Sequence, residues 1–420
     1  MKHRLVSHVG LALFALSMAC DAGKGDSVSV GGSGGSGQSS GATQPDTSAS
    51  TSDVVSSAAQ FMTGSTGAGM TCNSGPDEDF DQDGFTFNQG DCNGCDKNVN
   101  PSAIEVVITD PDPMTGMVPE PADEDCDGTK DNPEAMLCDT GLPLAPGSAM
   151  DAAKAIELCK VASGPKDWGV VTAKFTGADG SAAGITDQVG VMPKFGNVIS
   201  ARGGDSLFVL ASGKARTVGQ AGACGTCSCG TGVQGTPPTG FPQDNGCGTA
   251  DVIYDDRALE LEIRAPSNAV GYGFDFRFFT FEYPDYVCSY VNDQFIALVN
   301  PPPTGSLNGN IAFDNMSNPV SVNIAFFDVC NVPGDPCNAN AAEMGNTGFD
   351  VWNCGFNDGY AGGTSWLHTV APVTGGQTFT IRFAIWDTGD SLLNSTSIID
   401  NWVWVANGGT VTVGTNPVPQ

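Results

Sequence analysis

The chain has 420 residues, with 47 Asp and Glu against 17 Lys and Arg, which gives a formal net charge of −30. A chain this acidic should repel the phosphate backbone of nucleic acids, so we expect no nucleic-acid partner. Its hydrophobic fraction of 40% is too high for a disordered polyanion and can supply at least one sizeable core. The 15 Cys favour an oxidising compartment.

Histidine is scarce, because the chain has only His3, His8 and His368. The first two lie in a leader, and a single remaining His cannot build a multi-His zinc site. A Ser-His-Asp or Cys-His catalytic group would have to use His368. We expect a packed or surface role for this residue and no catalytic residues in the chain.

Residues 1–20 read as an export signal, with a basic start and an apolar stretch of about ten residues that is too short to span a bilayer. The segment ends at Cys20 and resembles a bacterial lipoprotein signal. This resemblance implies lipidation of Cys20 and a membrane as partner, at the outer membrane or cell surface of a Gram-negative bacterium. Ser17 and Ala19 also fit ordinary signal-peptide cleavage, which would give a secreted protein. Without Cys20 an even number of 14 Cys remains.

Residues 21–70 contain 28 Gly, Ser and Thr, including GGSGGSGQSSG at 31–41. Such a segment cannot bury enough apolar surface to offset its ordering entropy. We expect a disordered linker between the leader and the folded part.

Residues 71–140 form an acidic module, since 77–139 holds 18 Asp and Glu against two Lys. With so few apolar residues, the module needs disulfides or a metal to fold. Asp79, Asp81 and Asp83 are spaced two apart and are followed by Gly84. Carboxylates at this spacing converge in a tight loop, which is the pattern that opens a Ca²⁺ loop.

The carbonyl of Phe85 is a further expected ligand of this loop. An EF-hand would require Glu at the twelfth position, which is Gly90, so the loop is of calcium type without being an EF-hand. Oxygen ligands favour calcium as the cofactor.

The same region resembles the MopE-type metal-binding motif of bacteria. The resemblance rests on Asp79–Gly84, Gly90–Cys92, Asn100-Pro101 with Glu105, and Asp125–Gly128. It implies metal binding at the cell surface, with Asp91, Asp125 and Asp127 as additional ligands. A Pro-rich insertion at 106–122 departs from the pattern. The alternative is an acidic, disulfide-held spacer without a specific ion.

The remainder of the chain, 148–406, predicts a β-sandwich or jelly roll, followed by a short tail at 407–420. A single helix is expected at 148–161, from the helical spacing of Ala, Ile and Leu. Alternating apolar residues then indicate short strands, for example at 258–263, 272–278, 320–326 and 379–385. The overall fold class is therefore mainly β, preceded by a small irregular module that disulfides and metal stabilise.

Three stretches of this region are similar to the choice-of-anchor L domain. They are WGVVTAKFTGADG at 168–180, FTFEYPDYVCSYVNDQFIALV at 279–299, and the closing segment 362–404 that ends in SIIDNWVW. The resemblance spans about 150–406. It implies a surface or secreted bacterial protein and does not assign an activity.

Polar residues near two predicted strand ends are the candidate site of the β domain. They could bind Ca²⁺ at the rim of the sandwich if the strands are neighbours, or they could cap backbone amides in turns. A glycosidase pair such as Glu282 with Asp387 is a further alternative. The candidates are Glu282, Asn292, Asp293, Asp387, Asp390 and Asp400.

The cysteines are disulfide candidates, and their connectivity cannot be read from the sequence. CGTCSC at 224–229 could in principle bind zinc with Cys247, but disulfides fit an exported chain better. The candidates fall into sets of six, four and four: Cys72, Cys92, Cys95, Cys126, Cys138 and Cys159; Cys224, Cys227, Cys229 and Cys247; Cys288, Cys330, Cys337 and Cys354.

These features together predict an exported, lipid-anchored surface protein with a calcium module and a β-sandwich for binding or adhesion. The expected partner of the sandwich is an extracellular glycan or a surface protein. The alternatives are an extracellular hydrolase that uses carboxylates and a passive structural component of the envelope.

Overall fold

A computed structural model describes residues 75–418, apart from 113, 133–136, 244–245, 351–358 and 407–408. The predicted leader with Cys20, the linker at 21–70, Cys72 and Cys354 lie outside the described residues. Among the described helices, none is both long and apolar enough to cross a membrane.

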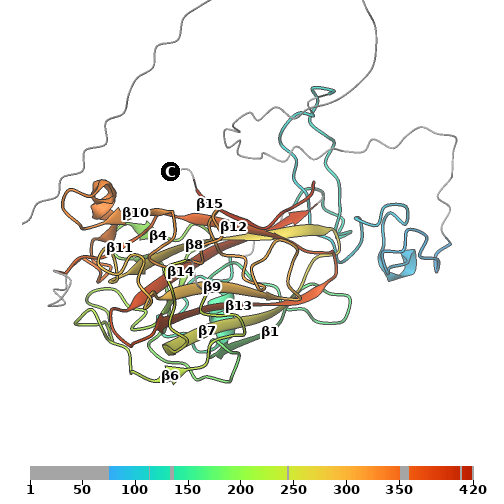
Figure 1. The fold of residues 1–420 in the computed structure, drawn as a ribbon. Helices are drawn as coiled ribbons and strands as arrows, with labels where there is room; N and C mark the ends of the chain where they lie inside the picture. The colour runs from blue at the N-terminus through green and yellow to red at the C-terminus, as the bar shows by residue number, and fades with distance from the viewer. Residues whose placement is uncertain are drawn as a thin grey trace, which may run out of the picture. The chain divides into compact units, whose positions relative to one another are not determined.

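The predicted sandwich consists of two antiparallel sheets that lie one above the other (Figure 1). The five-stranded sheet has the order β1-β7-β13-β9, and β6 pairs with β7. Its strands are β1 (Gly169–Thr176), β6 (Gln234–Gly235), β7 (Ile253–Arg264), β9 (Gln294–Asn300) and β13 (Thr378–Thr388).

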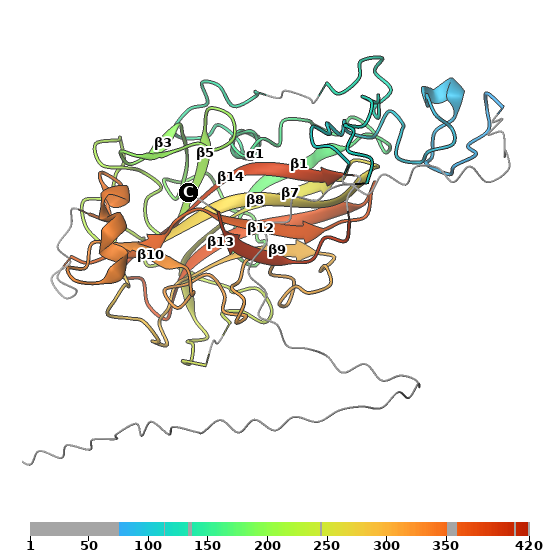
Figure 2. The ribbon, with the colours of Figure 1, turned by 90° about the horizontal axis from the view of Figure 1, so that it is seen from above.

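The eight-stranded sheet has the order β10-β11-β8-β14-β5-β2, with β12 between β8 and β15. Seen from above, β14, β8 and β12 run side by side (Figure 2). The strands are β2 (Val189–Met192), β5 (Leu207–Ala211), β8 (Ala269–Thr280), β10 (Phe327–Cys330), β11 (Gly362–Thr364), β12 (Leu367–Pro372), β14 (Ser395–Ala406) and β15 (Gly414–Pro417). A separate hairpin joins β3 (Lys194–Phe195) to β4 (Ile199–Ser200).

The main core lies between the two sheets and follows the alternation of the sequence. Leu259, Leu261 and Ile263 of β7 are fully buried, as are Phe274 and Phe276 of β8. Inward-facing side chains of two sheets pack in this way when every second residue is apolar. The mainly β fold predicted from the sequence is therefore confirmed.

An aromatic stack closes one end of this core. Tyr272 stacks on Phe379 at 4.9 Å and on Trp402 at 4.8 Å between ring centroids. Trp404 meets Trp402 edge to face at 5.5 Å, so the two tryptophans share a face as predicted. Offset and edge-to-face contacts of this kind add to the stabilisation that burial gives.

Two elements differ from the sequence prediction. The helix α1 spans only Ala149–Lys154, because the chain turns at Glu157, whose φ is +66°. The segment expected as a strand at 320–326 forms turns, with only Val320 bridged to Phe295. Its apolar residues Val322 and Ile324 are nevertheless buried, so burial alone produced the alternation.

The module at 75–140 has little regular structure. Its one assigned element is a 3₁₀ helix, η1, at Phe87–Gln89, and a second 3₁₀ helix, η2, lies in the sandwich domain at Pro336–Met344. Asn268 ties the module to the sandwich, because it accepts the Ile104 amide at 3.0 Å and donates to the Ile104 carbonyl at 2.8 Å.

Candidate metal centres

The predicted calcium loop brings its three carboxylates together. Asp79, Asp81 and Asp83 each offer an oxygen within 4.8 Å of the others. Their remaining oxygens hold the loop, since Asp79 accepts the Gly84 amide at 3.0 Å and Asp83 accepts the Phe85 amide at 2.7 Å. One oxygen of each carboxylate is buried and has no hydrogen-bond partner. Three such oxygens around one point form a donor set for a hard cation.

The electrostatics of this loop agree with a cation site. Burial, together with the charges of Asp81, Asp91 and Asp79, raises the pKa of Asp83 to about 6, although a backbone hydrogen bond opposes this rise. Burial likewise raises the pKa of Asp81. The predicted ligand Asp91 is 3% exposed and acts on both residues through its charge. The Phe85 carbonyl stays a predicted ligand.

A second loop repeats the first in both spacing and hydrogen bonding. Asp123, Asp125, Asp127 and Gly128 stand at the same intervals. The Gly128 amide donates to Asp123 at 3.1 Å, and the Asp127 amide donates to Asp125 at 3.0 Å. The Thr129 amide donates to Asp127 at 2.7 Å, just as the Phe85 amide donates to Asp83 in the first loop.

The second loop completes its carboxylate set with a residue from elsewhere. Oδ2 of Asp127 accepts a hydrogen bond from the side-chain amide of Asn132 at 2.9 Å, so this carboxylate already has a partner. The hydrogen bond lowers the pKa of Asp127. Glu105 takes the third position, with an oxygen within 4.8 Å of those of Asp123 and Asp125. Oε2 of Glu105 and Oδ1 of Asp123 are buried without a hydrogen-bond partner.

The sequence therefore pointed to part of the second loop. Asp125 was a predicted ligand and lies in the cluster, whereas Asp127 lies beside it. Asp123 was missed although Asp123-x-Asp125-x-Asp127-Gly128 repeats the first motif in the printed sequence. Glu105 belongs to the motif on which the metal-binding resemblance rests, but it was not predicted as a ligand.

Disulfides hold both the module and the sandwich. Cys92 pairs with Cys126 across the two loops, and Cys138 pairs with Cys159 beyond α1. In the sandwich a disulfide joins Cys247 to Cys288, one from each predicted set of four. Further pairs are Cys224–Cys229 and Cys330–Cys337, and Cys95 and Cys227 are also disulfide-bonded.

A buried carboxylate cluster lies at the rim of the sandwich, where three predicted residues meet. Glu282, Asp293 and Asp387 are at most 3% exposed. Oε2 of Glu282 accepts the Asp293 amide at 2.9 Å, and Asp293 accepts Ser395 at 2.6 Å and the Thr388 amide at 3.1 Å.

Burial, followed by the neighbouring negative charges, raises the pKa of each of these three carboxyls well above its ordinary value. Oδ1 of Asp387 is buried and without a hydrogen-bond partner. No ion pair to Lys, Arg or His is formed by the three within the described part of the chain. A proton or a cation must therefore compensate this rim cluster.

The other predicted rim residues lie in different surroundings. Asn292 is 6% exposed, with a buried Oδ1 that has no partner. Asp390 is half-buried and accepts the Leu392 amide at 2.9 Å. Asp400 lies five residues beyond Ser395 on β14, about 16 Å along the strand, and belongs to another group of side chains.

His368 has a carboxylate partner and, in the described part of the chain, no hydrogen bond to a nucleophile. Its Nδ1 lies 2.6 Å from Oδ1 of Asp275, which also pairs with Arg202 at 2.6 Å. Among the hydrogen bonds of the described residues, none joins His368 to a hydroxyl or thiol. The pair therefore lacks the third member of a Ser-His-Asp group.

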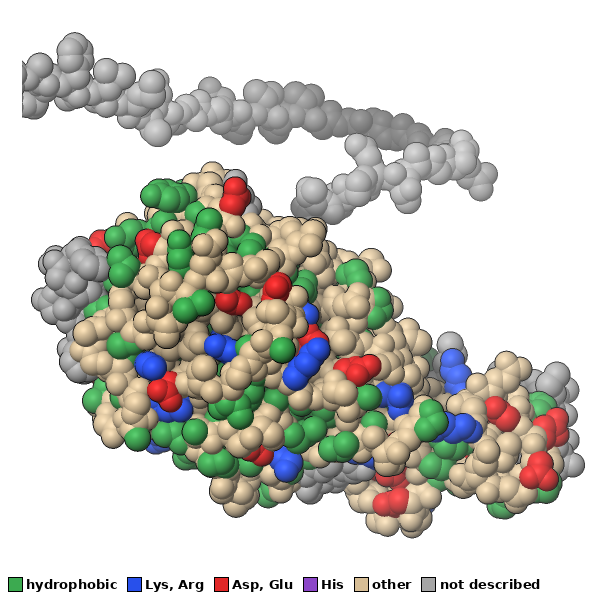
Figure 3. All heavy atoms as spheres, turned by 90° about the horizontal axis from the view of Figure 1, so that it is seen from below, with side chains coloured by type: hydrophobic (Ala, Val, Ile, Leu, Met, Phe, Trp, Pro, Cys, Tyr) green, Lys and Arg blue, Asp and Glu red, His purple; other side chains and the backbone are tan. Residues whose placement is uncertain are grey.

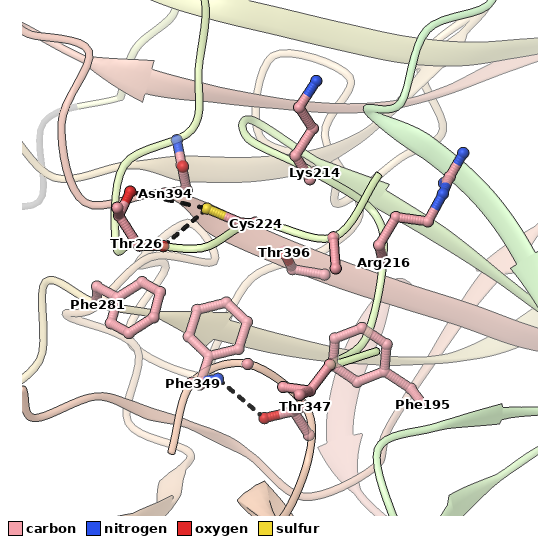
Figure 4. A pocket seen from close by; sticks show the side chains of 13 residues that line it. Phe195, Lys214, Arg216, Cys224, Thr226, Phe281, Thr347, Phe349, Asn394 and Thr396 are labelled. Carbon is pink, nitrogen blue, oxygen red and sulfur yellow. Dashed lines mark hydrogen bonds between the residues drawn. The ribbon is translucent and has the colours of Figure 1, made fainter. Parts of the chain in front are cut away.

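Two pockets differ in what they could hold. The aromatic one, walled by Phe195, Phe281 and Phe349, has about 30 Å³, and Lys214 and Arg216 extend away from its rings (Figure 4). This is room for one water, well below a ligand site of about 300 Å³ or more.

The second pocket has about 370 Å³ and is lined by polar and charged side chains, among them Asp187, Gln188, Asp256 and Arg257. It is large enough for a small polar ligand. Across the face of the molecule in Figure 3, hydrophobic and charged side chains are interspersed, and no single kind covers a large area.

A disulfide-rich antiparallel β-sandwich with acidic loops is the architecture of an extracellular protein domain. Residues 187–401 match the model of the choice-of-anchor L domain, and the chain belongs to this family. Membership indicates a bacterial surface protein, and the family is not a known enzyme family. No curated protein and no solved structure matches the chain.

Proposed function

We propose that this protein is a lipid-anchored surface protein that binds extracellular ligands through its sandwich and is rigidified by Ca²⁺, without catalysis. The observation that carries the calcium part is the repeated loop. Two loops each gather three carboxylates, at Asp79, Asp81 and Asp83 and again at Glu105, Asp123 and Asp125. All three residues of the first group, and Glu105 and Asp123 of the second, have a buried oxygen without a hydrogen-bond partner. Calcium is the ion that such oxygen donors favour outside the cell.

The test of the module is calcium titration of the full chain by calorimetry. Asp81→Asn and Asp125→Asn each remove one ligand from one loop and should each weaken one binding event by at least about tenfold. Asp110→Asn, an exposed residue of the insertion, is the matched control. Equal titration curves for wild type and all three variants would reject the hypothesis of a calcium module. The segment would then be an acidic spacer without a specific ion.

The rim cluster of Glu282, Asp293 and Asp387 supports a further Ca²⁺ position at the sandwich. Among the described residues no cationic side chain pairs with its buried charge, and Oδ1 of Asp387 and Oδ1 of Asn292 are metal-donor atoms without hydrogen-bond partners. An ion here would fix β13 and β9 to the start of β14, because Asp293 already accepts Ser395.

For the extracellular ligand we favour a glycan in the 370 Å³ pocket, whose polar lining offers several hydrogen-bonding side chains. A glycan array probed with the full chain tests this assignment. Binding that is lost in Asp187→Ala and kept in Asp110→Asn supports it. Binding that persists unchanged in Asp187→Ala places the ligand elsewhere.

Anchoring is tested separately from ligand binding. Wild-type protein expressed with a labelled fatty acid should incorporate the label, and Cys20→Ala should not. Label that persists in Cys20→Ala rejects the lipid anchor and leaves secretion by ordinary signal cleavage.

A further inference from the structure

A small pocket lies at the end of the sandwich opposite the rim cluster. It has a volume of about 270 Å³ and is formed where β8 and β13 begin and where β9 and β12 end. The strand residues that line it are Tyr272, Phe379, Val299 and Pro372. The rim cluster lies at the other ends of β8, β9 and β13. Because the pocket shares no lining residue with the 370 Å³ pocket, the two are separate cavities.

The lining of this end pocket is mostly apolar. Three consecutive prolines, at 301–303, form part of the wall together with Val373, and the further polar side chains are Thr304, Thr374 and Gln377. None of the described residues that line the pocket is charged, although the chain carries a net charge of −30. Apolar walls with a few polar groups are typical of small-molecule sites. We therefore expect an uncharged and largely apolar ligand.

Hydrogen bonds hold the walls of the end pocket in place. The Thr374 amide donates to Oε1 of Gln377 at 3.1 Å, and the Gln377 amide donates to the Thr374 carbonyl at 3.0 Å. In the proline wall, the Pro303 carbonyl accepts the amide of Ser306 at 3.1 Å and its hydroxyl at 2.8 Å. Each proline also has a fixed φ. The pocket is therefore preformed, and binding requires little further ordering of the protein.

One polar atom in the lining lacks a partner. Tyr272 is 1% exposed, and its ring is stacked between Phe379 and Trp402. Its hydroxyl is buried and makes no hydrogen bond within the described part of the chain, whereas a buried Tyr hydroxyl usually has a partner. Burial raises the pKa of Tyr272, so the hydroxyl keeps its proton and can donate. Among the described lining residues, Tyr272 alone has such an atom.

We propose that the end pocket binds a small, uncharged aromatic molecule that carries one hydrogen-bonding group, such as a phenol. The ring would contact the prolines at 301–303 and Phe379, and its polar group would take the hydrogen bond that the Tyr272 hydroxyl lacks. An apolar cavity of about 150 Å³ is enough for benzene, so this pocket has room for one substituted ring. A sugar ring fits less well, because Gln377 already accepts the Thr374 amide.

The experiment titrates the isotope-labelled full chain with para-cresol, toluene and benzoate, and follows the amides of Thr304, Val373 and Phe379 by NMR. Para-cresol should shift these amides and bind more tightly than toluene, which lacks a hydroxyl, whereas the charged benzoate should not bind. Tyr272→Phe removes only the hydroxyl, so it should weaken para-cresol binding about 2- to 12-fold and leave toluene binding unchanged. Tyr290→Phe is the matched control, because Tyr290 is 65% exposed and does not line the pocket.

Wild-type crystals soaked with para-iodophenol provide a second measurement that needs no variant. An anomalous iodine peak beside Phe379 and the prolines at 301–303 supports the site. The proposal is overturned if para-cresol leaves the three amides unshifted, or if Tyr272→Phe binds it as tightly as wild type. It is also overturned if methyl glucoside shifts the same amides and para-cresol does not displace it. None of these results bears on the calcium loops or the 370 Å³ pocket, which consist of other residues.

Discussion

Asp79 and Asp123 hold the same place in two loops, because Oδ2 of each accepts the amide of the glycine five residues later, at 3.0 and 3.1 Å. The agreement extends to the next two hydrogen bonds of each loop. The loops differ at the third acidic position, where Asp83 serves the first loop and Glu105 replaces Asp127 in the second. Matched substitutions in the two loops are therefore informative controls for each other.

The first prediction uses the glycines of these loops. Gly84 and Gly128 have φ of +96° and +92°, and a Cβ at either position would meet nothing within 4 Å. Gly84→Ala and Gly128→Ala should therefore act only through the backbone, which disfavours positive φ by about 1–2 kcal/mol. We expect calorimetry to show affinity for Ca²⁺ reduced about 5- to 30-fold at one site in each variant. Normal binding by both variants would contradict this backbone effect.

The second prediction concerns pH in the presence of a chelator. The carboxyls of Asp83, Asp400 and Glu157, with pKa values that burial raises to about 6, 7 and 9, hold their protons more tightly in the folded chain than in the unfolded chain. Their contribution to stability is fully present below about pH 4 and is lost as pH rises through these values. The temperature of the unfolding midpoint should therefore decrease as the pH rises from about 5 to about 9.

Added Ca²⁺ should reduce that decrease, since it stabilises the ionised carboxylates of the first calcium loop. Differential scanning fluorimetry across the range, with and without Ca²⁺, measures both effects. Asp275 does not contribute to this decrease. Burial raises its pKa, but partners such as His368 and Asn401 outweigh burial and lower the pKa overall. The effect of Asp275 on stability therefore changes only below about pH 4. A midpoint that rises with pH in chelator contradicts the prediction.

The third prediction distinguishes a rim ion from simple capping. Asp387→Asn removes a fully buried charge that lacks a cationic partner, so the chelated variant should unfold at a higher temperature than chelated wild type. With Ca²⁺ the variant should unfold at a lower temperature than wild type, because it lacks one ligand of the ion. Thermal unfolding in both conditions tests this, with Asp110→Asn, at an exposed residue outside the rim cluster, as the control. If Asp387 only caps the backbone, Ca²⁺ will not change the order.

The fourth prediction concerns the disulfide between the loops. Cys92 and Cys126 are separated by 34 residues, and a bond that closes such a loop contributes about 2–4 kcal/mol. The double variant to Ser should lower the stability of the module by this amount and weaken Ca²⁺ binding at the second loop. Chemical unfolding followed by calorimetry measures both. The Cys330–Cys337 pair, separated by 7 residues in the sandwich, is the control and should leave Ca²⁺ binding unchanged.

The sequence predicted those parts of the fold that depend on local pattern. Alternation in β7, β8 and β13 identified the sandwich, and the spacing of Asp79, Asp81 and Asp83 identified the first loop. The prediction was wrong about the length of α1, because the helix ends at Lys154 and Glu157 has a φ of +66°, neither of which the spacing of Ala, Ile and Leu reveals. It was also wrong about the strand at 320–326, where buried residues alternate within turns.

The sequence identified the rim residues Glu282, Asp293 and Asp387 from their places near strand ends, but it did not group Asp400 with Asp139 and Glu157. Asp139 and Asp400 are far apart along the chain, and each alone resembles an ordinary turn or strand residue. Glu157 follows a short helix, where a Glu is usually solvated. Only the approach of β14 to the turn after α1, together with the Gly203–Gly204 backbone, makes these three carboxylates neighbours.

The disulfide connectivity also determines how the folded part would carry mechanical load. A pull applied on the N-terminal side of Cys92 crosses directly to Cys126, and a pull at Cys138 crosses directly to Cys159. The covalent path therefore bypasses 93–125 and 139–158, which contain Glu105, Asp123, Asp139 and Glu157. A surface protein held under shear could thus transmit force to its sandwich while these carboxylates stay in place.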